Sequence, residues 1–129
     1  MRAYARELAF QIIFEKLFVK NQDIDEEFFV SLKKEEDREF AISIVRNYID
    51  NREEIEKLIE SHLIGYELSR VFKVDLALIS EALSEIIYLK TPVSIAINEV
   101  VNLAKKYSTE KSGRFINGVL SSIVKDLNI

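Results

Sequence analysis

The scarcity of glycine and proline constrains the fold of this sequence more than any other feature. The 129 residues include only three glycines and one proline. Sheet proteins need many tight turns, and those turns use glycine, proline, asparagine and aspartate heavily. Leucine, isoleucine, alanine, glutamate and lysine, which favour helices, are abundant instead. The sequence therefore predicts an all-α fold, in which long helices are joined by short loops.

The spacing of apolar residues predicts about seven helices. We expect them over about residues 3–20, 25–32, 36–50, 51–63, 74–89, 92–107 and 109–127. Asn51 followed by Glu54 resembles a capping pair at a helix start, Gly65 marks an end, and Pro92 suits a first helical position. The helix over 74–89 is apolar except for a narrow polar strip that includes Glu81, Ser84 and Glu85.

Composition argues against several classes of function. Cysteine is absent, which excludes disulfides and thiolate zinc sites, and His62 is the single histidine, so a metal site has no second histidine as ligand. No nucleophile and base stand in a recognisable arrangement, and we expect no enzyme activity, no metal and no cofactor. No apolar run approaches the roughly 18 to 20 residues of a membrane span. We expect a cytoplasmic protein without a membrane segment.

The net charge of −4 hides an uneven distribution of charged residues. Residues 1–20 carry four basic and two acidic side chains, and residues 100–129 carry five basic and two acidic ones. Residues 21–99 carry nine basic and eighteen acidic side chains. Local patches, not net charge, decide where a phosphate backbone can dock. Both ends of the chain are therefore candidates for nucleic-acid contact, with ordinary solvated faces as the alternative.

The last helix carries the clearest functional signal. Its residues at spacings of 3, 4, 3 and 4 form one line opposite the apolar face: Lys111, Arg114, Gly118, Ser121 and Lys125. A glycine inside a helix costs about 1 kcal/mol relative to alanine, and here it would let a phosphate or sugar approach the backbone. The ring of Phe115, beside this line, could stack on an unpaired base. The alternative is that Gly118 permits close helix packing and Phe115 belongs to the core.

Four segments of the sequence resemble the NusB family. They are the stretches ARELAFQIIF at 5–14, IAINE at 95–99, LAKKY at 103–107 and FINGVL at 115–120. The "NE" and "FxNGVL" pieces and their spacing are the most specific, and the resemblance spans nearly the whole chain. It implies a single RNA-binding domain over 1–129, made of two small packed helical bundles at about 1–65 and 66–129.

The resemblance also implies a function. Members of this family are transcription antitermination factors that bind single-stranded boxA RNA of ribosomal RNA transcripts together with the small-subunit ribosomal protein NusE. The complex helps RNA polymerase to read through terminators. The resemblance further allows a homodimer that uses the RNA surface.

Family contact positions carry over onto matching residues of this chain. For RNA, together with the line on the last helix, they are Arg2, Arg6, Gln11, Phe14, Lys111, Arg114, Phe115, Asn117, Gly118, Ser121 and Lys125. For NusE, they are Asp75, Glu81, Ser84 and Glu85, which we expect to form an exposed acidic strip suited to a basic partner.

Two alternative functions remain open from the sequence. One is a helical adaptor that binds only proteins. The other is an isolated relative of the RNA-binding domain of ribosomal-RNA cytosine methyltransferases, which resembles the same helical fold.

Overall fold

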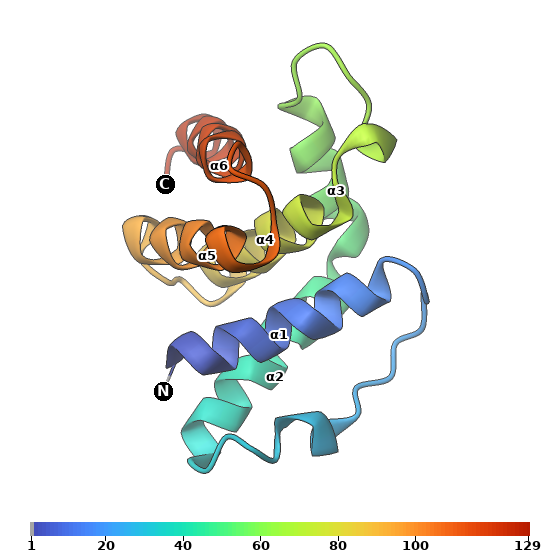
Figure 1. Cartoon of the computed structure of the whole chain (residues 1–129), viewed down its shortest axis with the longest axis vertical. Helices are drawn as coiled ribbons and strands as arrows, with labels where there is room; N and C mark the ends of the chain where they lie inside the picture. The colour runs from blue at the N-terminus through green and yellow to red at the C-terminus, as the bar shows by residue number, and fades with distance from the viewer. Residues whose placement is uncertain (1) are drawn as a thin grey trace.

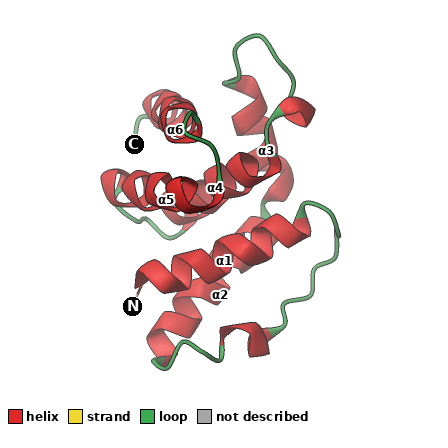
Figure 2. Cartoon of the chain, in the orientation of Figure 1, coloured by secondary structure: helices red, strands yellow, loops and turns green. Residues whose placement is uncertain are grey.

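The computed structural model describes residues 2–129, and every regular element in that range is helical (Figures 1 and 2). The long helices are α1 (Arg2–Lys16), α2 (Glu35–Asp50), α3 (Arg52–Ser61), α4 (Lys73–Leu83), α5 (Val93–Tyr107) and α6 (Ser112–Leu127). Three short helical turns accompany them: η1 (Glu26–Phe29), η2 (Leu68–Arg70) and η3 (Ser84–Tyr88). The predicted all-α fold is confirmed, with six long helices where about seven helices were expected.

Helix α1 lies between α2 and α4 and is buried around most of its circumference (Figure 1). The small side chains of Ala5 and Ala9 let the neighbouring helices approach, and Ile13 fills the space one turn further along. The helix ends at Lys16, earlier than the apolar pattern predicts. Phe18, counted as helical from its spacing, is 60% exposed in the loop that follows.

Helix α4 is the central element of the C-terminal half, and every residue from 75 to 83 in it is buried. It packs on α1, α5 and α6, and it continues without interruption into the wider helical turn η3. Lys90, with a φ of 59°, then turns the chain toward Pro92 at the start of α5. One continuous cluster of buried apolar side chains runs from α1 through α4 to α6.

Two predicted helix starts differ in detail from the structure. The expected helix over 25–32 is only the single turn η1, whose first amides are capped by Asp25 through a 3.1 Å bond from the Glu27 amide. A new helix does begin after Asn51, as predicted, but the Asn51 side chain donates back to the Asn47 carbonyl and leaves α3 without a side-chain cap.

Across residues 2–129, none of the helices combines the length and the apolar character that crossing a membrane requires.

Candidate nucleic-acid interface

The predicted basic line on α6 is exposed along its whole length. Ile116, Val119, Leu120 and Ile123 turn toward the core, and this leaves the opposite side of the helix open. The exposed residues of that side are Lys111, Arg114, Asn117, Gly118, Ser121 and Lys125. The Ser121 hydroxyl donates a 3.2 Å hydrogen bond to the Asn117 side-chain oxygen, one turn away. Three cations therefore flank a polar, uncovered stretch of helix.

Gly118 has open space where a side chain would be. A Cβ atom built at this position would meet no heavy atom within 4 Å among the described residues. The alternative from the sequence, a close approach by a second helix, is therefore wrong. Because packing does not require glycine here, its cost to the helix calls for another reason.

Phe115 lies at the edge of the core beside an exposed tyrosine. Its ring centroid is 6.0 Å from that of Tyr66, with an angle of 31° between the ring planes. The side chain of Phe115 is half-buried, so it belongs fully neither to the core nor to the surface. The exposed faces of such rings are flat and apolar, and an unpaired base can stack on them.

Two hollows open on either side of this aromatic pair. The first, of about 270 Å³, is lined by Tyr66, Arg70, Val71, Phe72, Asp75, Thr109, Lys111, Ser112 and Phe115. The second, of about 360 Å³, is lined by His62, Leu63, Ile64, Tyr66, Arg114, Phe115, Gly118, Val119 and Ser122. Each hollow thus combines aromatic faces with basic side chains at its rim. This combination suits single-stranded nucleic acid, because the rings stack on bases and the cations meet phosphates.

The sequence reasoning missed the loop that faces α6. Tyr66, Arg70 and Phe72 come from the segment between α3 and α4, and all three are exposed. Ile64 in the same segment is 92% exposed. A cluster of exposed aromatic and basic residues in a loop was visible in the sequence, but loops have no periodicity that would indicate which surface they join.

At the N-terminus, the structure separates the two arginines predicted to contact RNA. Arg2 is exposed and lies over the Phe40 ring, 4.0 Å from its centroid. Arg6 is buried, and its Nε donates to both carboxylate oxygens of Glu85, at 2.8 and 3.0 Å. A second carboxylate, that of Glu99, lies 3.8 Å from its guanidinium. In this conformation the Arg6 side chain is therefore bound inside the protein. Of the two arginines, only Arg2 is exposed to solvent.

Gln11 and Phe14 are also occupied by contacts within the protein. Gln11 donates a 2.9 Å bond to the Tyr107 hydroxyl, which in turn donates to Glu7. Lys106 donates to the same Glu7 carboxylate at 2.6 Å, and these two hydrogen bonds hold the pKa of Glu7 below its ordinary value. The Phe14 ring packs between those of Phe10 and Phe18. This network ties α1 to the end of α5.

The two groups of predicted RNA residues do not meet in one patch. Helix α5 lies between α1 and α6 (Figure 1), and α6 packs on α3, α4 and α5. The exposed α6 line, Phe115 and the loop over 62–72 form one surface, which we call the α6 surface. The start of α1 is a separate one.

The acidic strip predicted to face a protein partner is buried. Glu81, Ser84 and Glu85 expose no surface and Asp75 almost none, so the expectation of a solvent-facing strip is wrong. Helices α1 and α2 cover it: Arg6 pairs with Glu85, and the Ser84 hydroxyl donates a 2.7 Å bond to the Ile44 carbonyl. Glu85 and Ser84 need not face water, because each has a hydrogen-bond partner inside the protein.

Asp75 is bonded to the loop before α6. Its two carboxylate oxygens accept hydrogen bonds from the hydroxyls of Ser108, at 2.6 Å, and Ser112, at 3.0 Å. These bonds anchor the first turn of α6 to α4. Asp75 therefore positions the α6 surface from beneath.

Glu81 is buried without compensation of this kind. No donor of residues 2–129 bonds to either of its carboxylate oxygens. Burial, the charge of neighbouring Glu85 and a hydrogen bond that protonated Glu81 can donate to Glu85 raise the pKa of Glu81 well above its ordinary value. Protonation is the expected response of a carboxyl group in such surroundings.

Comparisons with known proteins agree with this architecture. A model of the NusB family matches residues 3–125. The transcription antitermination protein NusB of Acetivibrio thermocellus is 40% identical over 129 aligned residues, covering 96% of this chain and 88% of that protein.

Two solved structures share the fold over almost the whole chain. A NusB structure from T. maritima has a TM-score of 0.86 at 29% identity and covers 98% of this chain and 92% of that one. A structure of antitermination factors NusB and NusE in complex with double-stranded RNA has a TM-score of 0.83 at 30% identity. It covers 97% of this chain and 96% of its counterpart.

Proposed function

Since the chain belongs to the NusB family, we propose that it acts in transcription antitermination by binding single-stranded boxA RNA together with the ribosomal protein NusE. Its relatives are named antitermination proteins, so the role is non-enzymatic. RNA is bound in a cytoplasmic antitermination complex with RNA polymerase.

The observation that carries the RNA proposal is the α6 surface. Lys111, Arg114 and Lys125 supply positive charge along one line, while Tyr66 and Phe115 supply rings at its edge. Bases that are splayed out of a strand can stack on such rings, whereas bases inside a duplex cannot reach them. The surface therefore favours single-stranded RNA, with the uncovered backbone at Gly118 open to a close phosphate or sugar.

NusE is the proposed protein partner, and the structure of a related NusB with NusE and RNA supports this choice. The buried strip of Glu81, Ser84 and Glu85 offers no side chain to a partner in this conformation. We therefore propose the partner without assigning its contact to those three residues.

The α6 surface also distinguishes this function from an adaptor that binds only proteins. Aromatic residues and arginine also occur at protein–protein interfaces, so the uncovered backbone at Gly118 between basic residues is the feature that favours RNA. Binding to RNA is the readout that separates the two functions, because a protein-only adaptor would not bind it. Phosphate contacts would make that binding weaken as the salt concentration rises.

The test is a titration of a short boxA-like RNA with the chain at several salt concentrations, with and without NusE. We expect salt-sensitive binding that NusE strengthens. Arg114→Ala should weaken binding and reduce the salt slope by about one, as expected for one lost phosphate contact. Arg46→Ala is the matched control, because Arg46 is an exposed arginine of α2 outside the α6 surface. This variant should leave the salt slope unchanged.

Two results would contradict the proposal. Absence of RNA binding in both conditions, with a folded chain that still binds NusE, would leave the adaptor function. Equal slopes for Arg114→Ala and the unmodified chain would remove Arg114 from the interface.

A further inference from the structure

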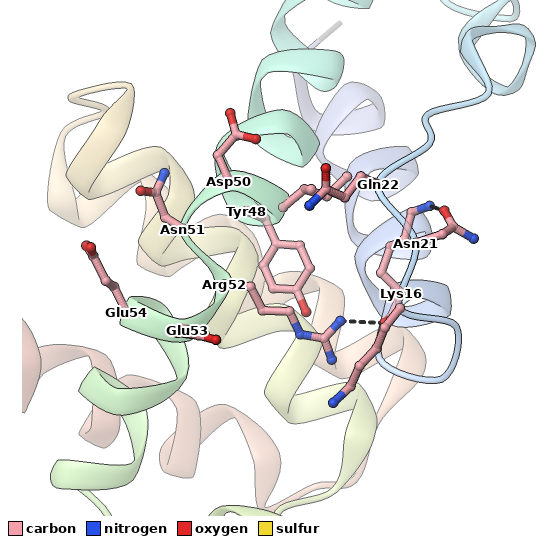
Figure 3. Close-up of a pocket in the computed structure, with 11 residues that line it drawn as sticks. Lys16, Asn21, Gln22, Tyr48, Asp50, Asn51, Arg52, Glu53 and Glu54 are labelled. Atoms are coloured by element: carbon pink, nitrogen blue, oxygen red, sulfur yellow. Dashed lines mark hydrogen bonds between the residues drawn. The ribbon is translucent and has the colours of Figure 1, made fainter.

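A hollow on another part of the molecule has no role in the proposed function. It opens where α1 ends, α2 ends and α3 begins, and it has a volume of about 400 Å³ (Figure 3). Its lining residues are Lys16, Lys20, Asn21, Gln22, Tyr48, Ile49, Asp50, Asn51, Arg52, Glu53 and Glu54. None of them belongs to the α6 surface.

Lys16 places a positive charge in this hollow without a counter-ion. The residue is only 4% exposed, and its ammonium donates to the Asn21 side-chain oxygen and the Asp23 carbonyl. No carboxylate of residues 2–129 lies within the 4.0 Å of an ion pair. Buried charges are ordinarily compensated by an opposite charge, so an anion is the missing partner.

Tyr48 supplies an unused hydrogen-bond donor. Its side chain is fully buried, and its hydroxyl has no hydrogen-bond partner among the described residues. Figure 3 shows the ring directed into the hollow, with the hydroxyl toward the Arg52 guanidinium. Burial raises the pKa of Tyr48 to about 12, so the hydroxyl keeps its proton at neutral pH. The charged side chains that act on this hydroxyl are Arg52 and, paired with it, Glu56. Buried tyrosine hydroxyls usually find a partner, and this one makes no hydrogen bond with either.

Arg52 and the start of α3 add further donors. The arginine Nε donates to Glu56 at 3.0 Å and one terminal nitrogen donates to the Lys16 carbonyl at 2.7 Å. Its other terminal nitrogen makes no hydrogen bond with residues 2–129. The first amides of a helix have no partner within the helix, and Asn51 does not cap them with its side chain. Such amides favour anions.

Acidic residues at the rim limit the size of the ligand. Asp50, Glu53 and Glu54 are exposed there, opposite exposed Lys20. In Figure 3 the carboxylates of Asp50 and Glu54 point away from Tyr48. They would repel a long polyanion that ran across the rim, whereas a small anion can enter beyond them.

We propose that this hollow binds a phosphate group, either as inorganic phosphate or at the end of a small phosphomonoester. The oxygens of a phosphate can accept from Tyr48, Arg52 and the amides of α3, while its charge compensates Lys16. A tetrahedral anion suits donors that converge from several directions. The hollow is large enough to leave room for the rest of a small ester.

The experiment titrates the full chain, in a buffer without phosphate, with inorganic phosphate and separately with adenosine monophosphate. Binding is followed by amide NMR shifts and by the melting temperature, which rises when a ligand binds only the folded state. We expect saturable shifts at residues around Tyr48 and Arg52. Equal affinity for both probes would show that the site recognises the phosphate group alone. Tighter binding of adenosine monophosphate would identify a phosphomonoester as the ligand.

Tyr48→Phe tests the site with little risk to the fold, because it removes a hydroxyl that has no partner. We expect the affinity for phosphate to fall about tenfold or more, because a hydrogen bond to a charged acceptor is lost. The melting temperature without ligand should stay equal or rise. Lys16→Met should also weaken binding, whereas Lys57→Gln, at an exposed lysine of α3 outside the hollow, should not.

Three outcomes would overturn the proposal. The first is no saturable response to either probe. The second is equal weakening by Lys57→Gln, which would indicate general attraction of anions. The third is binding of a short RNA at this hollow without binding of phosphate or the monophosphate. None of them bears on the α6 surface, whose residues are different.

Discussion

The guanidinium of Arg6 lies 2.8 Å from the carboxylate of Glu85, and both side chains are buried. This ion pair joins α1 to the turn η3. The two residues are 79 positions apart in the sequence. The Thr91 hydroxyl donates to the same carboxylate at 3.1 Å, so both oxygens of Glu85 accept hydrogen bonds inside the protein. The pair links the first helix to the C-terminal half of the chain.

Arg6→Ala should therefore act on stability before it acts on any ligand. Removal of one partner leaves a buried, unpaired carboxylate, and the expected loss is about 3–5 kcal/mol in the free energy of unfolding. Arg2→Ala, at the exposed arginine one turn earlier, should cost no more than about 1 kcal/mol. Urea unfolding of the two variants measures the difference. Loss of RNA binding by Arg6→Ala at unchanged stability would instead place Arg6 at an RNA surface.

Glu81 should make the stability of the protein fall as pH rises. Because burial and the charge of Glu85 raise its folded-state pKa, the folded chain holds this proton more tightly than the unfolded chain. The resulting stabilisation is fully present below the ordinary glutamate pKa. It is lost as pH rises through the range up to the raised value.

Glu81→Gln keeps the shape of a protonated carboxyl group but cannot ionise. We expect it to flatten the decline of unfolding free energy with pH and to be at least as stable as the original chain at neutral pH. Glu39→Gln, at an exposed position of α2, is the control for loss of a carboxylate in general. The same pH dependence in Glu81→Gln and in the unmodified chain would show that Glu81 is ionised in the folded state.

His62 should contribute to stability in the same direction but through different contacts. Its Nδ1 lies 2.7 Å from the Leu58 carbonyl and its Nε2 lies 2.6 Å from the Asp126 carboxylate. The backbone hydrogen bond to Leu58, and then the contact with Asp126, raise the pKa of His62 above its ordinary value. The protonated form is therefore favoured in the folded state, and this stabilisation is lost as pH rises through the raised pKa.

Asp126→Asn should lower the pKa of His62, which NMR titration of the imidazole protons measures directly. Because the Asp126 carboxylate is largely exposed, added salt should reduce its effect in the unmodified chain. An imidazole that titrates identically in both proteins would show that Asp126 does not bond to His62 in solution.

The parts of the fold that the sequence predicts well are those with local signals. Pro92 marks the start of α5 to within one residue, since the helix begins at Val93, and the spacing of Ile116, Leu120 and Ile123 indicates both faces of α6. These features depend on neighbouring residues of one helix. The all-α fold follows from such signals taken together.

The strip on α4 and η3 shows what periodicity leaves undetermined. The spacing places Glu81 and Glu85 on one side of the helix, but it does not show that α1 and α2 cover that side. The ion pair with Arg6 depends on a partner 79 residues away, which no local pattern reveals. For the same reason Tyr66 was missed, because its place beside Phe115 is set by tertiary packing.

Phe115→Ala should reduce RNA affinity by roughly 1 to 3 kcal/mol if the ring stacks on a base. Because Phe115 is half-buried, the variant should also lose some stability, and binding must be measured where the chain is folded. Tyr66→Ala offers a cleaner comparison, since Tyr66 is more exposed and belongs to a loop. A lowered melting temperature with unchanged RNA affinity in both variants would assign the pair to structure alone.

Gly118→Ala should change protein stability and RNA affinity in opposite directions. A methyl group here would meet no heavy atom within 4 Å, and alanine is the better helix former. We therefore expect the free energy of unfolding to rise by up to about 1 kcal/mol. RNA affinity should fall, because the methyl group keeps a phosphate or sugar from the backbone. Ser94→Ala, at an exposed position of α5 outside the α6 surface, is the control for adding an alanine to a helix and should leave RNA affinity unchanged. If Gly118→Ala raises stability and leaves RNA affinity unchanged, close backbone approach at Gly118 is not part of RNA binding.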